Sequence, residues 1–145
     1  MILSTLEIRW IIWSNMNYLD LILLLFLIIA LLFGLKSTSQ EFLTADNFGN
    51  KIAKDIVAVE FWVDWNSTNE FADLSELGDC EKYRIDIAKY PGLQKEYNVT
   101  CIPTVIIFES GDEKERFKAN IMFELEATKK DVQKSIDKIM LAKFN

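Results

Sequence analysis

The segment from Ile56 to Val63 is the feature that most restricts the possible folds of this chain. It is an almost continuous apolar run in which Glu60 is the one charged residue. A run of this length without alternation is typical of a strand that is covered on both faces, in the middle of a sheet flanked by helices. The sequence therefore predicts an α/β domain built around a central strand at 56–63.

The patterns on either side of this run extend the α/β order from about Ser39 to Lys143. We expect a strand at 40–43, a helix from Ala45 capped by Thr44, a helix at 67–77, a strand at 83–87, a helix at 93–97, two strands joined by a turn at 110–112, and a last helix opening at Thr128 with Asp131 in a capping box. Apolar and polar residues alternate from Phe117 to Glu126, which predicts a long last strand. Such an edge strand could accept another chain, or its charged outer positions could prevent that pairing.

A second apolar region lies near the N-terminus, where the run from Leu21 to Leu35 carries no charge. A helix of 15 to 17 residues spans roughly 25 Å, slightly less than the hydrocarbon core of about 30 Å. Trp10, Trp13 and Tyr18 lie just upstream and suit the interfacial aromatic belt. We therefore predict one transmembrane helix, at 18–36, between an N-terminal interfacial segment at 1–17 and a domain at 37–145.

A cleaved signal peptide is the alternative interpretation of the same apolar region. Its start would be Met16, which would leave no positively charged segment before the apolar run. The residues from Phe33 to Ser37 also offer no clean cleavage site with small residues. We therefore expect a retained, single-pass anchor through residues 18–35.

Charge and composition exclude two classes of function. The 145 residues carry a net charge of -6 with no basic cluster, which argues against nucleic acid as a partner. There is no His, and there are two Cys, which leaves no plausible zinc site and removes the commonest general base. We expect no metal and no cofactor.

Three motifs in the α/β region occur in a characteristic order. They are the segment from Leu43 to Phe48, the segment from Phe61 to Trp65, and Ile102-Pro103-Thr104. Together they resemble the thioredoxin family over about 100 of the 145 residues. The resemblance implies a thioredoxin-like fold, a central mixed sheet flanked by helices, with a cis peptide bond at Pro103 facing the active-site turn.

The active-site turn of that family carries Cys-Gly-Pro-Cys, whereas this chain has Asn66-Ser67-Thr68-Asn69. Dithiol exchange needs a thiolate nucleophile and a second thiol to resolve the mixed disulfide. The side-chain amides of Asn66 and Asn69 supply neither, so we expect no dithiol oxidoreductase activity. Asn66 is expected instead to cap the helix that begins there.

The resemblance also assigns roles to residues around this turn. Glu60 matches the buried acid of the family and Arg84 its basic partner, which implies a buried ion pair. Cys101 immediately precedes Ile102-Pro103 and is a candidate for a lone reactive thiol or for an inert one. Cys80 falls at the opposite end of the fold, too far away for a disulfide with Cys101.

The function that we expect is a membrane-anchored, redox-inactive, thioredoxin-like protein that binds protein partners as an accessory or scaffold subunit. Its contact surface would be the long last strand or a groove formed by Trp65, Asn66, Cys101, Ile102 and Pro103. The alternatives are a single-thiol redox protein that uses Cys101, and a chaperone-like module that holds unfolded clients.

Two further observations concern placement. The linker at 36–39 is short, so the domain should stay close to the bilayer. The Lys and Arg count around the helix favours a domain on the inner side. Anchored thioredoxin-like domains usually face the extracytoplasmic or lumenal side, and that is the side we expect. Asn66-Ser67-Thr68 and Asn98-Val99-Thr100 match the N-glycosylation pattern, which would matter only if the domain enters a eukaryotic secretory lumen.

Overall fold

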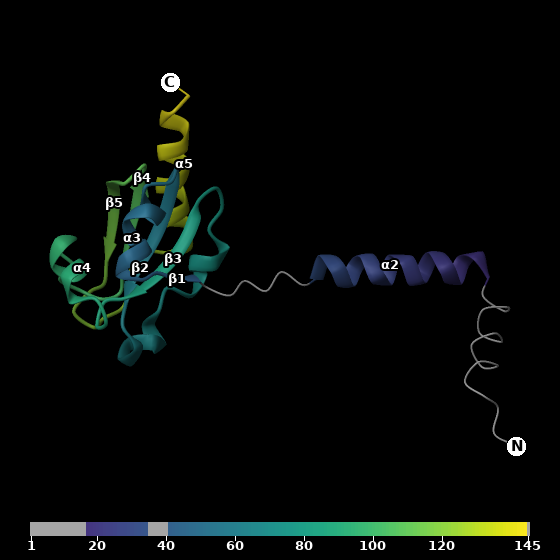
Figure 1. Cartoon of the computed structure of the whole chain (residues 1–145), viewed down its shortest axis with the longest axis horizontal. Coiled ribbons are helices and arrows are strands. Elements are labelled where there is room, and N and C mark those ends of the chain that lie inside the picture. The colour runs from purple at the N-terminus through teal and green to yellow at the C-terminus, as the bar shows by residue number, and fades with distance from the viewer. Residues whose placement is uncertain (1–16, 35–40, 145) are drawn as a thin grey trace, which may run out of the picture. The chain divides into compact units, whose positions relative to one another are not determined.

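The structure is a computed structural model that describes residues 17–34 and 41–144 (Figure 1). The chain divides into two units between Thr38 and Ser39. The first contains helix α2, Tyr18–Gly34, whose side chains from Leu21 to Leu27 are exposed. Within the described ranges, no helix combines the length and the apolar character needed to cross a membrane. The rest of the predicted interfacial segment, with Trp10 and Trp13, and the C-terminal end of the predicted span lie outside the described residues.

The second unit is an α/β domain with a five-stranded mixed sheet in the order β1-β3-β2-β4-β5. The strands are β1 Glu41–Phe42, β2 Ile56–Trp62, β3 Glu81–Asp86, β4 Thr104–Glu109 and β5 Asp112–Lys118. β1, β3 and β2 are parallel, whereas β4 is antiparallel to both β2 and β5. Every residue of β2 is buried, which confirms the central strand predicted from its apolar run.

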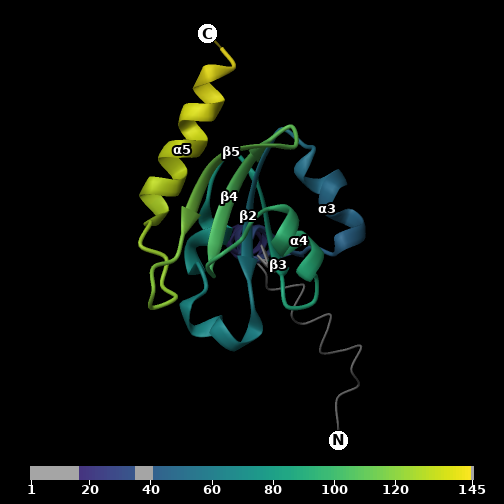
Figure 2. The same ribbon diagram turned by 90° about the vertical axis from the view of Figure 1, so that its left-hand side faces the viewer.

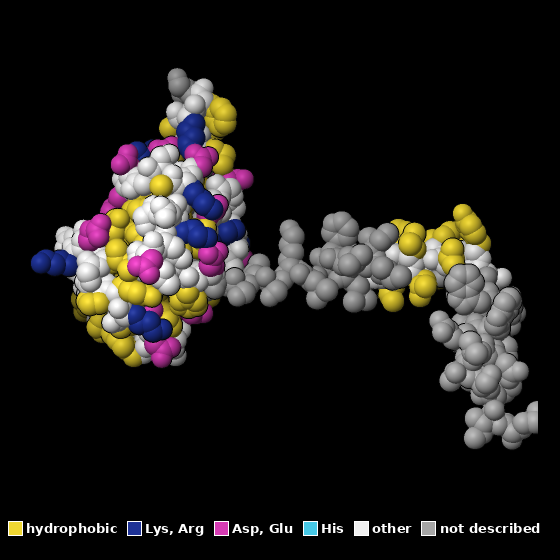
Figure 3. Space-filling view, in the orientation of Figure 1, with side chains coloured by type: hydrophobic (Ala, Val, Ile, Leu, Met, Phe, Trp, Pro, Cys, Tyr) yellow, Lys and Arg dark blue, Asp and Glu magenta, His cyan; other side chains and the backbone are white. Residues whose placement is uncertain are grey.

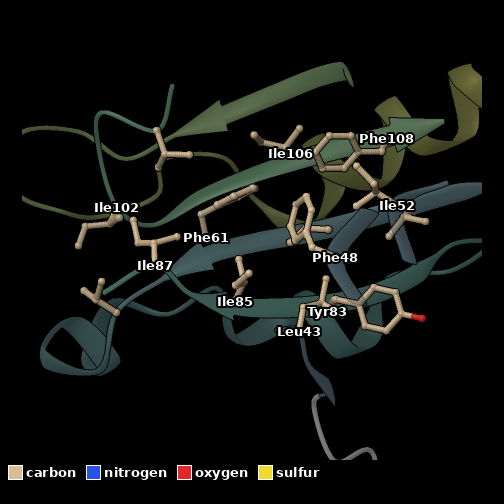
Figure 4. Close-up of a cluster of buried hydrophobic side chains, with 14 residues drawn as sticks. Leu43, Phe48, Ile52, Phe61, Tyr83, Ile85, Ile87, Ile102, Ile106 and Phe108 are labelled. Carbon is tan, nitrogen blue, oxygen red and sulfur yellow. The ribbon is translucent and has the colours of Figure 1, made fainter. Parts of the chain in front are cut away.

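Helices cover both faces of this sheet (Figure 2). On one face, α3 (Ala45–Ile52) and α4 (Pro91–Glu96) lie over a core that contains Phe48, Phe61 and Phe108 (Figure 4). On the other face, α5 (Lys129–Ala142) contributes Val132 and Ile136 to a second core. Thr44 is the N-cap residue of α3, as predicted, and forms a capping box with Asn47; the predicted capping box of Thr128 with Asp131 is also present. The fold is the expected α/β arrangement.

The predicted helix at 67–77 is wrong. Two short 3-10 helices stand in its place, η1 at Asp64–Asn69 and η2 at Ala72–Glu76, and Glu70 between them is extended, with ψ 151°. The buried Glu60 carboxylate accepts the backbone N–H of Phe71 at 2.7 Å. Because this N–H donates to the carboxylate, it cannot donate to a helical carbonyl oxygen. The helix is interrupted at this point.

The predicted long last strand is also wrong. β5 begins at Asp112 and ends at Lys118, and the chain then makes a tight loop that is closed by a single bridge between Ala119 and Leu125. The side chain of Asn120 causes the change, because its Oδ1 accepts the backbone N–H groups of both Met122 and Glu124, at 2.8 and 3.2 Å. An Asn that bonds its own following backbone favours a turn over a strand.

Candidate functional site

The two asparagines that stand at the family's cysteine positions form a hydrogen-bonded pair at the carboxyl end of β2. Asn69 Nδ2 donates to Asn66 Oδ1 at 3.0 Å, and Asn66 Nδ2 donates to the carbonyl oxygen of Phe123 at 3.2 Å. Asn66 is 5% exposed. The predicted helix cap is not formed: the N-cap residue of η1 is Val63, and Asn66 lies at a kink within η1, with non-helical φ −108° and ψ 26°. Its side chain joins η1 to the loop after β5.

The loop and η1 together expose four large apolar side chains, which we call the apolar tip. Trp65 is 67% exposed, Ile121 94%, Met122 67% and Phe123 44%. The rings of Trp65 and Phe123 meet edge to face, with centroids 5.5 Å apart. Figure 3 shows hydrophobic side chains gathered at the lower end of the domain. Sequence reasoning missed the three loop residues, although Asn120 inside an alternating pattern was a signal for a turn.

The segment around Pro103 lies at the same end of the sheet. The Ile102–Pro103 peptide bond is cis, which confirms the expectation from the resemblance. Thr104 pairs with Phe61 near the end of β2, and the backbone N–H of Ala119 donates to the carbonyl oxygen of Pro103 at 3.0 Å. The structure therefore brings the cis-proline segment, the end of β2 and the start of the loop to one end of the domain.

The predicted groove offers little accessible surface. Three of its five residues, Asn66, Ile102 and Pro103, are buried, whereas Cys101 is half-buried and Trp65 is exposed. The Thr104 hydroxyl donates to the carbonyl oxygen of Cys101 at 2.6 Å, which holds this segment against the sheet. The accessible apolar surface at this end is consequently the tip rather than the groove.

A buried ionic network lies inside the domain, on β2 and the neighbouring strand β3. Arg84 Nε donates to Glu60 Oε2 at 2.7 Å, and Arg84 Nη1 donates to Glu70 Oε2 at 2.8 Å. The ion pair implied by the resemblance is thus present, with Glu70 as an additional member. Burial raises the pKa of Glu60, while the Phe71 N–H and the Arg84 charge oppose that rise. The network fixes the break between η1 and η2.

Both cysteines are free thiols. Cys80 precedes β3, whereas Cys101 lies near the start of β4, which runs antiparallel to β2; the two therefore sit at opposite ends of the sheet. Burial raises the pKa of the Cys80 thiol to about 11, which keeps it protonated at neutral pH. The Cys101 Sγ lies 3.8 Å from the hydroxyl of Thr100. In the part of the chain that the structure describes, no group of three metal-ligating side chains occurs.

Comparisons with known proteins agree with this fold. The thioredoxin family profile matches residues 39–138. A thioredoxin of Mycoplasma genitalium is 31% identical over 70 residues, which cover 44% of this chain and 69% of that protein. A thioredoxin of Chlamydia trachomatis is 29% identical over 82 residues, covering 52% and 80%. Among solved structures, a mutant thioredoxin from Halobacterium salinarum superposes with a TM-score of 0.58 at 18% identity, over 70% of this chain and 91% of that chain.

Proposed function

Because this chain belongs to the thioredoxin family, we propose that it is a redox-inactive, membrane-anchored member that binds other proteins. It acts as an accessory or scaffold subunit of a membrane-associated assembly. It keeps the fold of the family, and the asparagine pair at the site joins η1 to the loop after β5. In this proposal the domain faces the extracytoplasmic or lumenal side, as anchored thioredoxin-like domains usually do.

The observation that carries this proposal is the Asn66–Asn69 amide pair. The two side chains have the spacing of a dithiol and contact each other at 3.0 Å, but an amide neither forms a nucleophilic anion nor exchanges with a disulfide. The second amide hydrogen bond, to Phe123, makes this pair part of the folded structure. The site therefore has a structural role that is independent of catalysis.

The membrane part of the proposal rests on the apolar residues from Leu21 to Leu35. Their described side chains, Leu21 to Leu27, are exposed around helix α2 and would be unfavourable in water. A bilayer would cover them, and the few residues before β1 would keep the domain near its surface. Extraction of native membranes at alkaline pH tests this: we expect the full chain to stay in the membrane pellet, and release into the supernatant would contradict the anchor.

A disulfide-reduction assay on the full chain in detergent tests the redox part. We expect no turnover of a dithiol-dependent substrate above that of a Cys80→Ser/Cys101→Ser variant. The control is the Asn66→Cys/Asn69→Cys variant, which restores the dithiol spacing on the same scaffold. Turnover by the natural sequence that disappears in Cys101→Ser would reject redox inactivity and support the single-thiol alternative.

A further inference from the structure

The apolar tip is built as a rigid projection. Besides the two bonds to its side chain, Asn120 accepts the N–H of Phe123 at its backbone carbonyl at 3.1 Å, and its own N–H donates to the carbonyl oxygen of Glu124 at 2.9 Å. The side-chain amide of Asn66 donates a further hydrogen bond, to the carbonyl oxygen of Phe123. The loop is therefore closed by hydrogen bonds on several sides, and Ile121 and Met122 project at its end.

Phe123 shows that this shape is maintained against local preference. Its φ is +61°, a left-handed conformation that a bulky residue rarely adopts because it is strained. The conformation turns the Phe123 ring onto Trp65. A surface that is already ordered loses little further entropy on binding, so a preorganised apolar projection favours association.

Charge around the tip indicates what it binds. Exposed Asp64 precedes Trp65, exposed Glu124 follows Phe123, and Glu126 accepts a hydrogen bond from the side-chain amide of Asn120. Lys118 is also exposed, at the end of β5, so these four charged residues have a net charge of −2. A net acidic rim is repelled by the negative surface of an anionic membrane. It complements a partner whose apolar pocket is bordered by Lys or Arg.

We propose that the apolar tip, Trp65 with Ile121 to Phe123, docks into a concave apolar pocket with a basic rim on a protein partner. This inference rests on the proposed protein-binding function and replaces the groove as its contact surface. Ile121 and Met122 enter the pocket, and Trp65 and Phe123 form the wall behind them. Exposed large apolar side chains that cluster in this way mark interaction sites.

Photo-crosslinking in the native membrane tests the tip directly. A photoreactive side chain replaces Ile121 in the full chain, and in a matched control it replaces Phe144, which is 81% exposed at the other end of α5. We expect position 121, and not position 144, to give one discrete protein adduct whose attachment site maps to an apolar pocket next to Lys or Arg. An adduct with lipid, an adduct with a second copy of this chain, or equal labelling from both positions would overturn the proposal.

A double variant distinguishes an error in the docking proposal for the tip from an error in the proposed protein-binding function. Met122→Ser combined with Ile121→Ser changes side chains that are mostly exposed, so the domain should still fold. We expect at least a tenfold loss of the co-purifying partner, the effect of removing a binding hot spot, and a loss of a few fold for Glu124→Lys. If the natural chain has a stoichiometric partner that this double variant retains, the tip is wrong while the proposed function stands; if the natural chain has none, the proposed function itself fails.

Discussion

Two regions of the domain differ in how closely they match what the thioredoxin resemblance implies. One is the ionic network of Glu60 and Arg84, and the other is the asparagine pair with the loop after β5. Glu60 and Arg84 occupy the expected positions and form the expected pair. At the site, the cysteine positions carry amides, and the loop from Asn120 to Glu124 projects apolar side chains that the family resemblance did not imply. The ion pair inside the sheet thus keeps the family arrangement, whereas the residues at the site and in the loop depart from it.

The largest effect is expected from a substitution in the buried ionic network. Arg84→Met removes the cation from a carboxylate that is fully buried, and leaving one buried partner of such a pair costs about 3–5 kcal/mol. Urea unfolding of the full chain in detergent measures it. As a control, Glu70→Gln changes the partly exposed member of the network and should cost under about 1 kcal/mol. Equal effects of the two variants would contradict a buried pair as the main interaction.

The next test follows the rate at which the Cys80 thiol is alkylated. With the pKa of Cys80 at about 11, its thiolate at pH 8 should be roughly two orders of magnitude scarcer than that of an ordinary thiol. Alkylation followed by mass spectrometry should therefore label Cys80 only near pH 11 or after unfolding, whereas a Cys in an unfolded reference peptide reacts at pH 8. The Cys101→Ser variant leaves Cys80 as the thiol whose labelling is followed. Rapid labelling of Cys80 in that variant at pH 8 would show that the start of β3 is more open than the structure indicates.

The amide pair is tested by Asn66→Ala. The change leaves the Phe123 carbonyl and the Asn69 amide without this partner, and we expect a loss of about 1–3 kcal/mol in the free energy of unfolding. Ser67→Ala, at an exposed neighbour, is the control and should stay within about 0.5 kcal/mol. A loss for Asn66→Ala no larger than the control would mean that the asparagines are merely tolerated at the site.

The smallest expected effect concerns pH. Because the pKa of Glu60 is raised in the folded state, the folded chain binds its proton more tightly than the unfolded chain. This contribution to stability is fully present below the unfolded pKa of about 4.3 and is lost as pH rises through the raised pKa. The difference in unfolding free energy between the natural chain and Glu60→Gln should fall over that window. A difference that rises with pH instead would mean that the Arg84 charge outweighs burial.

Most of the domain could be predicted from the sequence because its signals are local and agree with one another. The apolar run gave the buried strand β2, Thr44 and Thr128 marked two helix starts, and the motif around Pro103 marked the cis bond. These features depend on neighbouring residues or on one clear family motif.

The two failures have a common physical reason. The segments at 67–77 and 117–126 have the expected periodic pattern. In each, however, a polar side chain accepts backbone N–H groups that the predicted helix or strand would use. Glu60 did so from a distant strand, which no local pattern can reveal. Asn120 did so within its own loop, where turn chemistry should have been weighed against alternation. The loop that carries the apolar tip lies in the second of these segments, where the alternating pattern predicted a strand instead of a turn.

The most direct measurement of the central claim is purification of the full chain from gently solubilised native membranes through a C-terminal tag, alongside the Cys80→Ser/Cys101→Ser variant. We expect both chains to bring down the same protein partner in a stoichiometric amount, without a mixed disulfide. A partner that is lost from the cysteine-free variant, or that is recovered only as a disulfide through Cys101, would contradict a redox-inactive binding protein.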